Sequence, residues 1–228
     1  MSPLSSRIFL HGFLGSPQDW TSMGIPQAQC PNLWEIAAKK EVCDFTSFRT
    51  YLLHQISSPV SLYGYSMGAR LALDFAVHHP EKVKKLVLFS VQPGLSEEDR
   101  AARKNLEDHW IQQLKTLDEK EFLAQWNAMP LFQGQANILA YPCDRSALIQ
   151  ALQIWGLSQQ ENHWQHLRSL PKNTYFVAGE HDSKFCAILD KIQQQSQHAC
   201  HILPGQAHRI PFYYTANRDE WHWTDDET

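Results

Sequence analysis

The sequence predicts an α/β fold in which a mostly parallel sheet, reduced at its N-terminal edge, carries a helical cap. Short apolar runs that end in Gly, Ser or Pro alternate with longer stretches of helical period, and this alternation is typical of strands joined by helices. The pentapeptide GYSMG at residues 64–68 stands between one such run and one such stretch. A long central segment has several helix starts and no strand pattern.

Composition favours one folded domain over residues 1–228. The chain is 43% hydrophobic and 19% charged, with a net charge of −4 and dispersed basic residues, which disfavours a nucleic-acid surface. Apolar runs stay well below the roughly 18 residues of a membrane helix. The five cysteines form no C-x-x-C pair, as expected in a reducing compartment. We therefore expect a soluble, cytoplasmic protein, a monomer or weak homo-oligomer, without metal, cofactor or membrane insertion.

Five short β-branched or apolar runs predict the strands, at residues 7–10, 60–63, 85–90, 174–178 and 201–203. A helix is predicted to begin after Asp44, a favourable N-cap residue, because large apolar side chains recur at helical spacing from Phe45 to Ile56. A second helix is predicted from Ser66 to the stop at His79-Pro80.

The segment from residue 96 to residue 170 is predicted to be helical. Three pairs in it resemble capping boxes, in which a side chain at the N-cap bonds the backbone three residues later: Ser96 with Asp99, Asp118 with Glu121, and Ser158 with Glu161. The strand and helix series resumes at Thr174. We therefore expect a helical cap at about 94–171, over the end of the sheet where α/β proteins bind ligands.

Ser66 is the candidate nucleophile. The G-x-S-x-G pattern directly after a strand and before a helix places the serine on a tight, strained turn, where side chains at the two glycine positions would clash. The helix N-terminus beside it favours developing negative charge. The alternative is an ordinary N-cap serine.

A serine needs an imidazole to take its proton, and the imidazole needs an acid to fix its tautomer. Asp182 follows the strand predicted at 174–178, and His208 follows the strand predicted at 201–203. Both therefore stand at the strand ends, in the chain order of serine, acid and histidine. Glu180 is the alternative acid.

Two backbone amides are candidates for an oxyanion hole. The sequence His11-Gly12-Phe13 closes the first predicted strand, and the amide after such a pair, together with the amide after the nucleophile, stabilises negative oxygen in this architecture. These amides are those of Phe13 and Met67. The alternative is a simple turn at the end of the strand.

The stretches LHGFLGSPQDW, GYSMGARLAL and GEHDSKF, at residues 10–20, 64–73 and 179–185, resemble the 2-succinyl-6-hydroxy-2,4-cyclohexadiene-1-carboxylate synthase family of the α/β-hydrolase superfamily. The resemblance implies an α/β-hydrolase fold and a lyase of menaquinone biosynthesis. Its triad removes a ring proton from 2-succinyl-5-enolpyruvyl-6-hydroxy-3-cyclohexene-1-carboxylate, and pyruvate leaves. The alternatives are a small-molecule esterase, thioesterase or C–C bond hydrolase, and an inactive relative retained for binding.

The resemblance also implies the residues that bind this small polycarboxylate. Arginine suits carboxylates because its planar fork donates two parallel hydrogen bonds. Arg70 stands four residues after Ser66, on the same helix face, and Arg103 matches a cap arginine of the family. Tyr65 and Trp126 match positions that line the pocket. The alternatives are a solvated cap face for Arg103 and ordinary packing for the cap tryptophans.

The chain departs from the family pattern at three places. The histidine turn is one residue shorter and has one histidine fewer, so His208 aligns either with the catalytic histidine or with the one that follows it. Asn32 stands where the family has Asp. A third cap arginine has no clear counterpart, and Arg145 is the nearest candidate.

Overall fold

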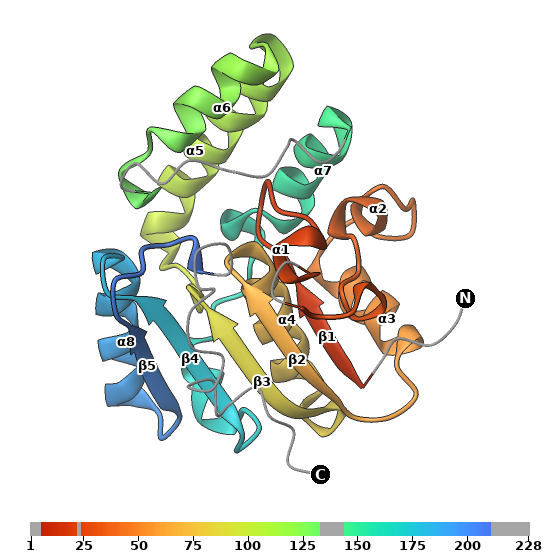
Figure 1. Cartoon of the computed structure of the whole chain (residues 1–228), viewed down its shortest axis with the longest axis vertical. Coiled ribbons are helices and arrows are strands. Elements are labelled where there is room, and N and C mark those ends of the chain that lie inside the picture. Colours follow the sequence, from red (N-terminus) through yellow and green to blue (C-terminus); the bar gives the residue numbers. More distant parts are fainter. Residues whose placement is uncertain (1–5, 22–23, 133–143, 211–228) are drawn as a thin grey trace.

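The structure is a computed structural model, and it describes residues 6–21, 24–132 and 144–210. Within these residues a five-stranded parallel sheet has the strand order β1-β2-β3-β4-β5 (Figure 1). The strands are β1 (Arg7–Leu10), β2 (Val60–Tyr65), β3 (Val83–Phe89), β4 (Thr174–Gly179) and β5 (Ala199–Leu203). All five predicted strands are confirmed, and four of them differ from the prediction at one or both ends by one or two residues.

The helices and short 3-10 turns fill the connections between the strands. The α-helices are α1 (Gln18–Thr21), α2 (Leu33–Ala37), α3 (Phe45–Gln55), α4 (Met67–His78), α5 (Glu97–Thr116), α6 (Glu119–Asn127), α7 (Arg145–Trp155) and α8 (Ser183–Gln195). The 3-10 turns are η1 (Gln27–Gln29), η2 (Pro80–Lys82), η3 (Pro130–Phe132), η4 (Leu157–Gln159) and η5 (Trp164–Ser169). Figure 1 shows α5, α6 and α7 beyond the carboxyl ends of the strands, where the cap was predicted.

Alternate residues of the strands pack into two apolar layers, one on each face of the sheet. Leu86 and Leu88 of β3 belong to the layer that holds the apolar faces of α3, α4 and α8. Val87 and Phe89, between and after them, belong to the opposite layer, with Trp20 of α1. Because β3 is buried on both faces, its sequence VKKLVLF ends in a continuous apolar run rather than an alternating one.

Side-chain caps begin the helices at most of the predicted places. Asp44 forms a capping box at the start of α3, and Ser96 and Asp118 cap α5 and α6. The prediction of a helix start at Ser158 is wrong, because this residue lies inside η4 and its hydroxyl donates to Glu107 at 2.5 Å. The buried carboxylate of Glu107 needs several hydrogen-bond donors, and the hydroxyl of Ser158 is one of them, so it does not cap a helix.

Glu107 also joins α5 to the segment after α7. Its carboxylate accepts the backbone N–H groups of Leu157, at 2.6 Å, and Ser158, at 3.3 Å, and it forms an ion pair with Arg103 at 2.7 Å. Only 2% of Glu107 is exposed. A buried carboxylate with a full set of donors holds its neighbours in one arrangement, so Glu107 positions Arg103.

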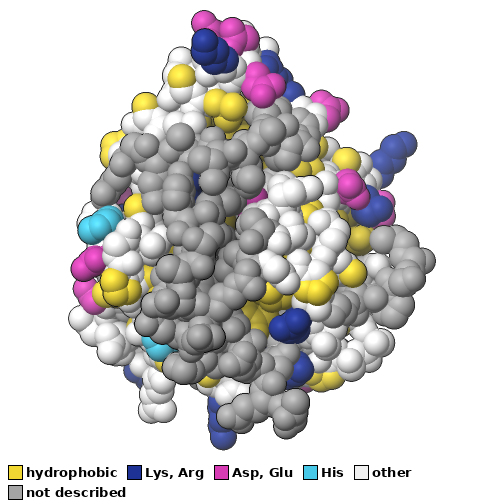
Figure 2. Space-filling view, in the orientation of Figure 1, with side chains coloured by type: hydrophobic (Ala, Val, Ile, Leu, Met, Phe, Trp, Pro, Cys, Tyr) yellow, Lys and Arg dark blue, Asp and Glu magenta, His cyan; other side chains and the backbone are white. Residues whose placement is uncertain are grey.

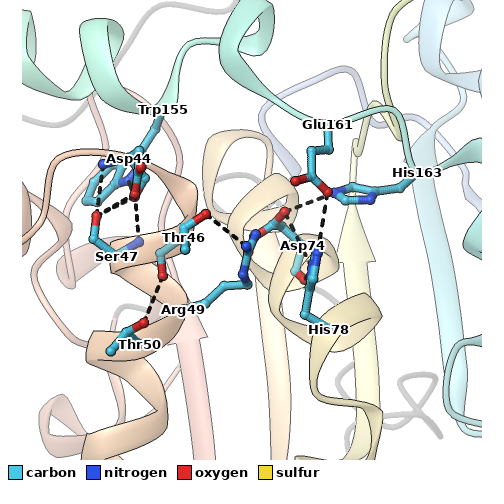
Figure 3. A network of polar contacts seen from close by, with 10 residues as sticks. All are labelled: Asp44, Thr46, Ser47, Arg49, Thr50, Asp74, His78, Trp155, Glu161 and His163. Atoms are coloured by element: carbon cyan, nitrogen blue, oxygen red, sulfur yellow. Dashed lines mark hydrogen bonds and ion pairs between the residues drawn. The ribbon is translucent and has the colours of Figure 1, made fainter.

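A second buried polar network connects α3, α4 and the segment before η5, as Figure 3 shows. Asp74 of α4 accepts from Arg49 Nη1 at 2.7 Å and contacts His163 Nε2 at 3.0 Å. Its other neighbours are His78 and, through His78, Glu161. Asp74, Glu161 and His163 lie close enough together to hold a metal ion. The guanidinium of Arg49 competes with any cation at this place, so we interpret the network as a structural one.

Figure 2 shows one face of the molecule, on which the coloured basic and acidic side chains are scattered and interspersed rather than gathered in a patch of one sign. Within the described residues, none of the helices combines the length and the apolar character needed to cross a membrane.

Candidate active site

The turn at Ser66 has the strained geometry that the sequence predicts. Ser66 joins β2 to α4 with φ 52° and ψ −108°, a region that non-glycine residues seldom adopt. A Cβ at position 64 would lie 2.5 Å from the carbonyl oxygen of residue 68, and one at position 68 would lie 2.5 Å from the carbonyl oxygen of His11. Glycine at both positions therefore lets the turn pack against β1 while Ser66 stays partly exposed.

Asp182 and His208 meet Ser66 at the carboxyl ends of the strands. Asp182 is the N-cap of α8, and its Oδ2 lies 2.6 Å from Nδ1 of His208. On the other side of the ring, Nε2 lies 3.2 Å from the hydroxyl oxygen of Ser66. Asp182 and His208 are both buried. A carboxylate at Nδ1 selects the tautomer whose Nε2 accepts a proton from the serine.

Burial lowers the pKa of His208, and the hydrogen bond from its ring to Asp182 opposes this effect. The imidazole is therefore held in the neutral form that acts as a base.

The shortened histidine turn still brings His208 to Ser66. Gly205 adopts φ 68°, and its N–H donates to Glu180 Oε2 at 2.8 Å. The N–H of His181 donates to the carbonyl oxygen of Gln206 at 2.7 Å. Glu180, the alternative acid, therefore fixes the turn, while Asp182 makes the contact with His208.

The loop that carries Phe13 is fixed by a buried, neutral histidine. His11 Nε2 accepts the N–H of Leu33 at 3.0 Å, so its Nδ1 bears the proton and donates to the carbonyl oxygen of Gly12 at 2.9 Å. Burial lowers the pKa of His11 to about 4. Phe13 and Met67 both line the cavity that holds Ser66. The amide of Met67 is at the first position of α4, where intrahelical acceptors are lacking.

Among the described residues that line the same cavity, four have cationic side chains. Two are the predicted arginines, and the others are Lys184 and Arg209. Arg70 is buried and donates to the carbonyl oxygen of Trp155 at 2.8 Å. Burial, and then the charge of Arg103, lowers the pKa of Arg70 to about 9. Like charges that converge without an equal number of carboxylates favour an anionic ligand.

The two predicted aromatic residues also line the cavity. Tyr65 is buried, its ring centroid lies 5.6 Å from that of His208, and burial raises the pKa of its hydroxyl. Trp126 is half-buried, and its ring lies 4.9 Å from the rings of Phe13 and Trp110. Trp110 is one of the cap tryptophans for which the sequence left ordinary packing and pocket lining open. It lines the cavity together with Trp126.

Lys184 and Arg209 are two cavity residues that the sequence did not predict. Lys184 stands two residues after Asp182, at the start of α8, and partial burial followed by the charge of Arg103 lowers its pKa. Arg209 is 4% exposed, donates to Asn127 Oδ1 at 2.6 Å and lies 3.8 Å from the ring centre of Phe132. Both could have been identified from the sequence as site candidates, because Lys184 is two residues from Asp182 and Arg209 directly follows His208.

Arg145 is not brought to the site. It is the first residue of α7, and its Nη1 donates to the carbonyl oxygen of Leu117 at 2.7 Å. The described residues that line the cavity do not include it. The geometry of the described residues therefore does not support Arg145 as a third substrate-binding arginine.

Comparison with known proteins identifies relatives over most of the chain. The family described as alpha/beta hydrolase fold matches residues 51–213. A Bacillus subtilis (strain 168) protein provisionally named 2-succinyl-6-hydroxy-2,4-cyclohexadiene-1-carboxylate synthase is 28% identical, across 89% of this chain and 83% of the relative. A protein of Enterobacter sp. (strain 638) with that name is also 28% identical, across 88% and 83%.

Solved structures share the fold. The structure of MenH from S. aureus superposes with a TM-score of 0.79 at 23% identity, across 96% of this chain and 94% of that one. A structure from work on carboxylesterases of the Thaumarchaeon Nitrososphaera gargenis has a TM-score of 0.61 at 14% identity, across 93% and 86%.

Proposed function

The chain belongs to the α/β-hydrolase family, and from this premise we propose that it is a carbon–oxygen lyase of menaquinone biosynthesis. Its substrate would be 2-succinyl-5-enolpyruvyl-6-hydroxy-3-cyclohexene-1-carboxylate, and its products 2-succinyl-6-hydroxy-2,4-cyclohexadiene-1-carboxylate and pyruvate. The observation that carries the proposal is the contact of Ser66, His208 and Asp182 in a cavity that four cationic side chains line. The names of the relatives, which cover most of the chain, support the same reaction.

The reaction begins at ring carbon 2, which is acidic because it lies next to the succinyl ketone. His208 Nε2, 3.2 Å from Ser66 Oγ, takes the serine proton as Ser66 removes the proton from carbon 2. The electron pair forms a double bond between carbons 2 and 3, and the existing double bond moves to carbons 4 and 5. The bond from carbon 5 to oxygen breaks, and the departing pyruvate enolate takes up one proton, the one that His208 has gained and then gives back, to become pyruvate.

Negative charge develops on the succinyl ketone oxygen when carbon 2 loses its proton. Phe13 and Met67 line the cavity together with Ser66, and their backbone amides are the donors that we propose for this oxygen. Fixed donors in a site that excludes water stabilise such a charge, and loss of one costs about 10²–10³ in rate.

The cations match the charge of this substrate, which has three carboxylates. Arg70 and Arg103 reach the cavity from α4 and α5, and Glu107 holds Arg103 in place. Lys184 and Arg209 add positive charge on the side of the cavity next to His208. A simple esterase has no need for so many cations, although the same three triad residues would serve it.

The decisive experiment supplies the enolpyruvyl precursor and, in parallel, nitrophenyl esters. We expect release of pyruvate from the precursor and little release of nitrophenol. The Ser66→Ala variant should lose pyruvate release while keeping the melting temperature of the parent protein. Ester turnover without pyruvate release would instead establish the hydrolase alternative.

A further inference from the structure

Two buried polar atoms on the wall of the cavity have no hydrogen-bond partner within the described part of the chain. They are Ser90 Oγ and Gln92 Oε1, and both residues line the cavity that holds Ser66. Only 2% of Ser90 is exposed. Buried polar groups are almost always hydrogen-bonded, since an unbonded one keeps the full cost of leaving water. Two unbonded atoms on one cavity indicate that a ligand supplies their partners.

The backbone that leads to Ser90 is hydrogen-bonded to the turn of the nucleophile. Its N–H donates to the carbonyl oxygen of Val177 at 2.8 Å, while the preceding carbonyl, that of Phe89, accepts the N–H of Ser66 at 2.9 Å. Ser90 itself has φ 50°, a left-handed conformation that is unusual for serine. Unfavourable backbone geometry of this kind is concentrated at functional sites.

The chemistry of the unbonded atoms selects one group of the substrate. The amide oxygen of Gln92 is an acceptor and needs a donor. The three substrate carboxylates are ionised at neutral pH, and the ketone and enol ether oxygens carry no hydrogen, so the ring hydroxyl is the one donor present. The serine hydroxyl can donate to the oxygen of that same group.

Building on the proposed function, we propose that Ser90 and Gln92 bind the ring hydroxyl of the substrate. Gln92 Oε1 accepts the hydroxyl hydrogen, and Ser90 Oγ donates to the hydroxyl oxygen. The arginines and Lys184 bind carboxylates, so they do not distinguish a hydroxylated ring from one without the hydroxyl. A buried hydrogen-bonding site does distinguish them, because the ligand that lacks the group leaves the protein atoms unbonded.

The test compares two ligands that share the succinyl and ring carboxylates. One is the hydroxylated lyase product, and the other is 2-succinylbenzoate, which has no ring hydroxyl. Their dissociation constants are measured by calorimetry for the wild type, Ser90→Ala and Gln92→Met. We expect each variant to bind the hydroxylated ligand about 10-fold more weakly and to bind 2-succinylbenzoate with a change below about 3-fold.

Melting temperature separates this role from a structural one. The hydroxyl of Ser90 bonds no group among the described residues, so Ser90→Ala should melt at the same temperature as the wild type or higher. Gln113→Met is the matched control, because Gln113 is also half-buried but does not line the cavity. Its affinities for both ligands should equal those of the wild type.

Equal weakening of both ligands in the variants, or unchanged binding of the hydroxylated one, would overturn the assignment. So would a wild-type protein that does not prefer the hydroxylated ligand. Pyruvate release by the wild type is measured alongside. Its absence would overturn the proposed lyase function, whereas the affinity ratio decides independently whether Ser90 and Gln92 bind the hydroxyl.

Discussion

At the scale of single residues, the chemistry of the site depends on which atom of each histidine ring is hydrogen-bonded, and to which partner. Asp182 lies at Nδ1 of His208, so Nε2 faces Ser66 as an acceptor. His11 is used differently, since its Nε2 accepts the backbone N–H of Leu33 and its Nδ1 donates to the carbonyl oxygen of Gly12, so both nitrogens bond backbone groups. Twelve histidines occur in the chain, and these contacts distinguish a reactive one from a structural one.

The lowered pKa of His208 predicts the acid limb of the pH profile. The neutral imidazole is the active base, and burial lowers its pKa, so the base form persists below the ordinary value near 6.5. We expect kcat/KM for pyruvate release to fall only as the pH drops through a midpoint below 6.5. Steady-state kinetics between pH 4.5 and 8, with circular dichroism at each pH to verify folding, measures this midpoint. An acid limb centred above pH 6.5 would contradict the assignment.

Lys184 is predicted to contribute to binding at the expense of stability. It stands in the first turn of α8, where the helix dipole disfavours a cation by a few tenths to about 1 kcal/mol. Lys184→Met should raise KM for the precursor about 10-fold, because a charge-assisted contact is lost. Its melting temperature should stay equal or rise slightly. Lys172→Met, at an exposed position outside the cavity, should change neither quantity, and a lowered melting temperature for Lys184→Met would indicate a structural lysine instead.

At the scale of elements, the ends of the strands and the starts of the helices build the site. Ser66 begins α4, and Asp182 caps α8. Phe13 and His208 follow β1 and β5. Because all five strands are parallel, their carboxyl ends share one edge of the sheet, which brings together residues far apart in sequence.

The close approach of α4 to β1 gives a prediction at this scale. In Gly68→Ala, the added Cβ would overlap the carbonyl oxygens of Leu10 and His11, which are backbone atoms with little freedom to move. We expect a loss of about 3 kcal/mol or more in the free energy of unfolding, measured with urea. Gly205→Ala is the control. Position 205 has φ 68°, and apart from its two chain neighbours no described residue has an atom within 4 Å of the added Cβ, so only a left-handed backbone cost of about 1–2 kcal/mol is expected. Equal losses would contradict the steric explanation.

At the scale of the whole molecule, two buried carboxylates hold the cap segment in place. One connects it to the helices beside the sheet, and the other connects two parts of the cap segment to each other. Asp74 joins α4 to Arg49 of α3 and to His163, which follows η4. Glu107 joins α5 to η4 and holds Arg103 toward the cavity. Arg70 adds a third connection through the carbonyl oxygen of Trp155. The position of Arg103 in the cavity that holds Ser66 therefore depends on buried polar contacts as well as on apolar packing.

Removal of Asp74 tests this dependence. Asp74→Ala removes the carboxylate partner of the buried Arg49 and His163, so we expect the free energy of unfolding to fall by about 3–5 kcal/mol. Asp108→Ala removes the partner of Lys104 in a more exposed ion pair and should cost no more than about 1 kcal/mol. Urea denaturation of both variants measures the difference. Similar losses in the two would show that Asp74 has no special structural role.

The sequence by itself determined the strands, the helices around the nucleophile and the residue types at the strand ends, because local periodicity, caps and a rare glycine pattern encode them. It also determined that Asp182 and His208 stand at strand ends beyond the nucleophile. Only the tertiary structure decided that His208 reaches Ser66 across the shortened turn, that Glu180 fixes this turn, and that Lys184 and Arg209 face the cavity while Arg145 does not. The same holds for Ser158 and for the unbonded atoms of Ser90 and Gln92. At these positions the hydrogen-bond partners and the residues that cause burial belong to segments distant in sequence, so no local sequence pattern predicts them.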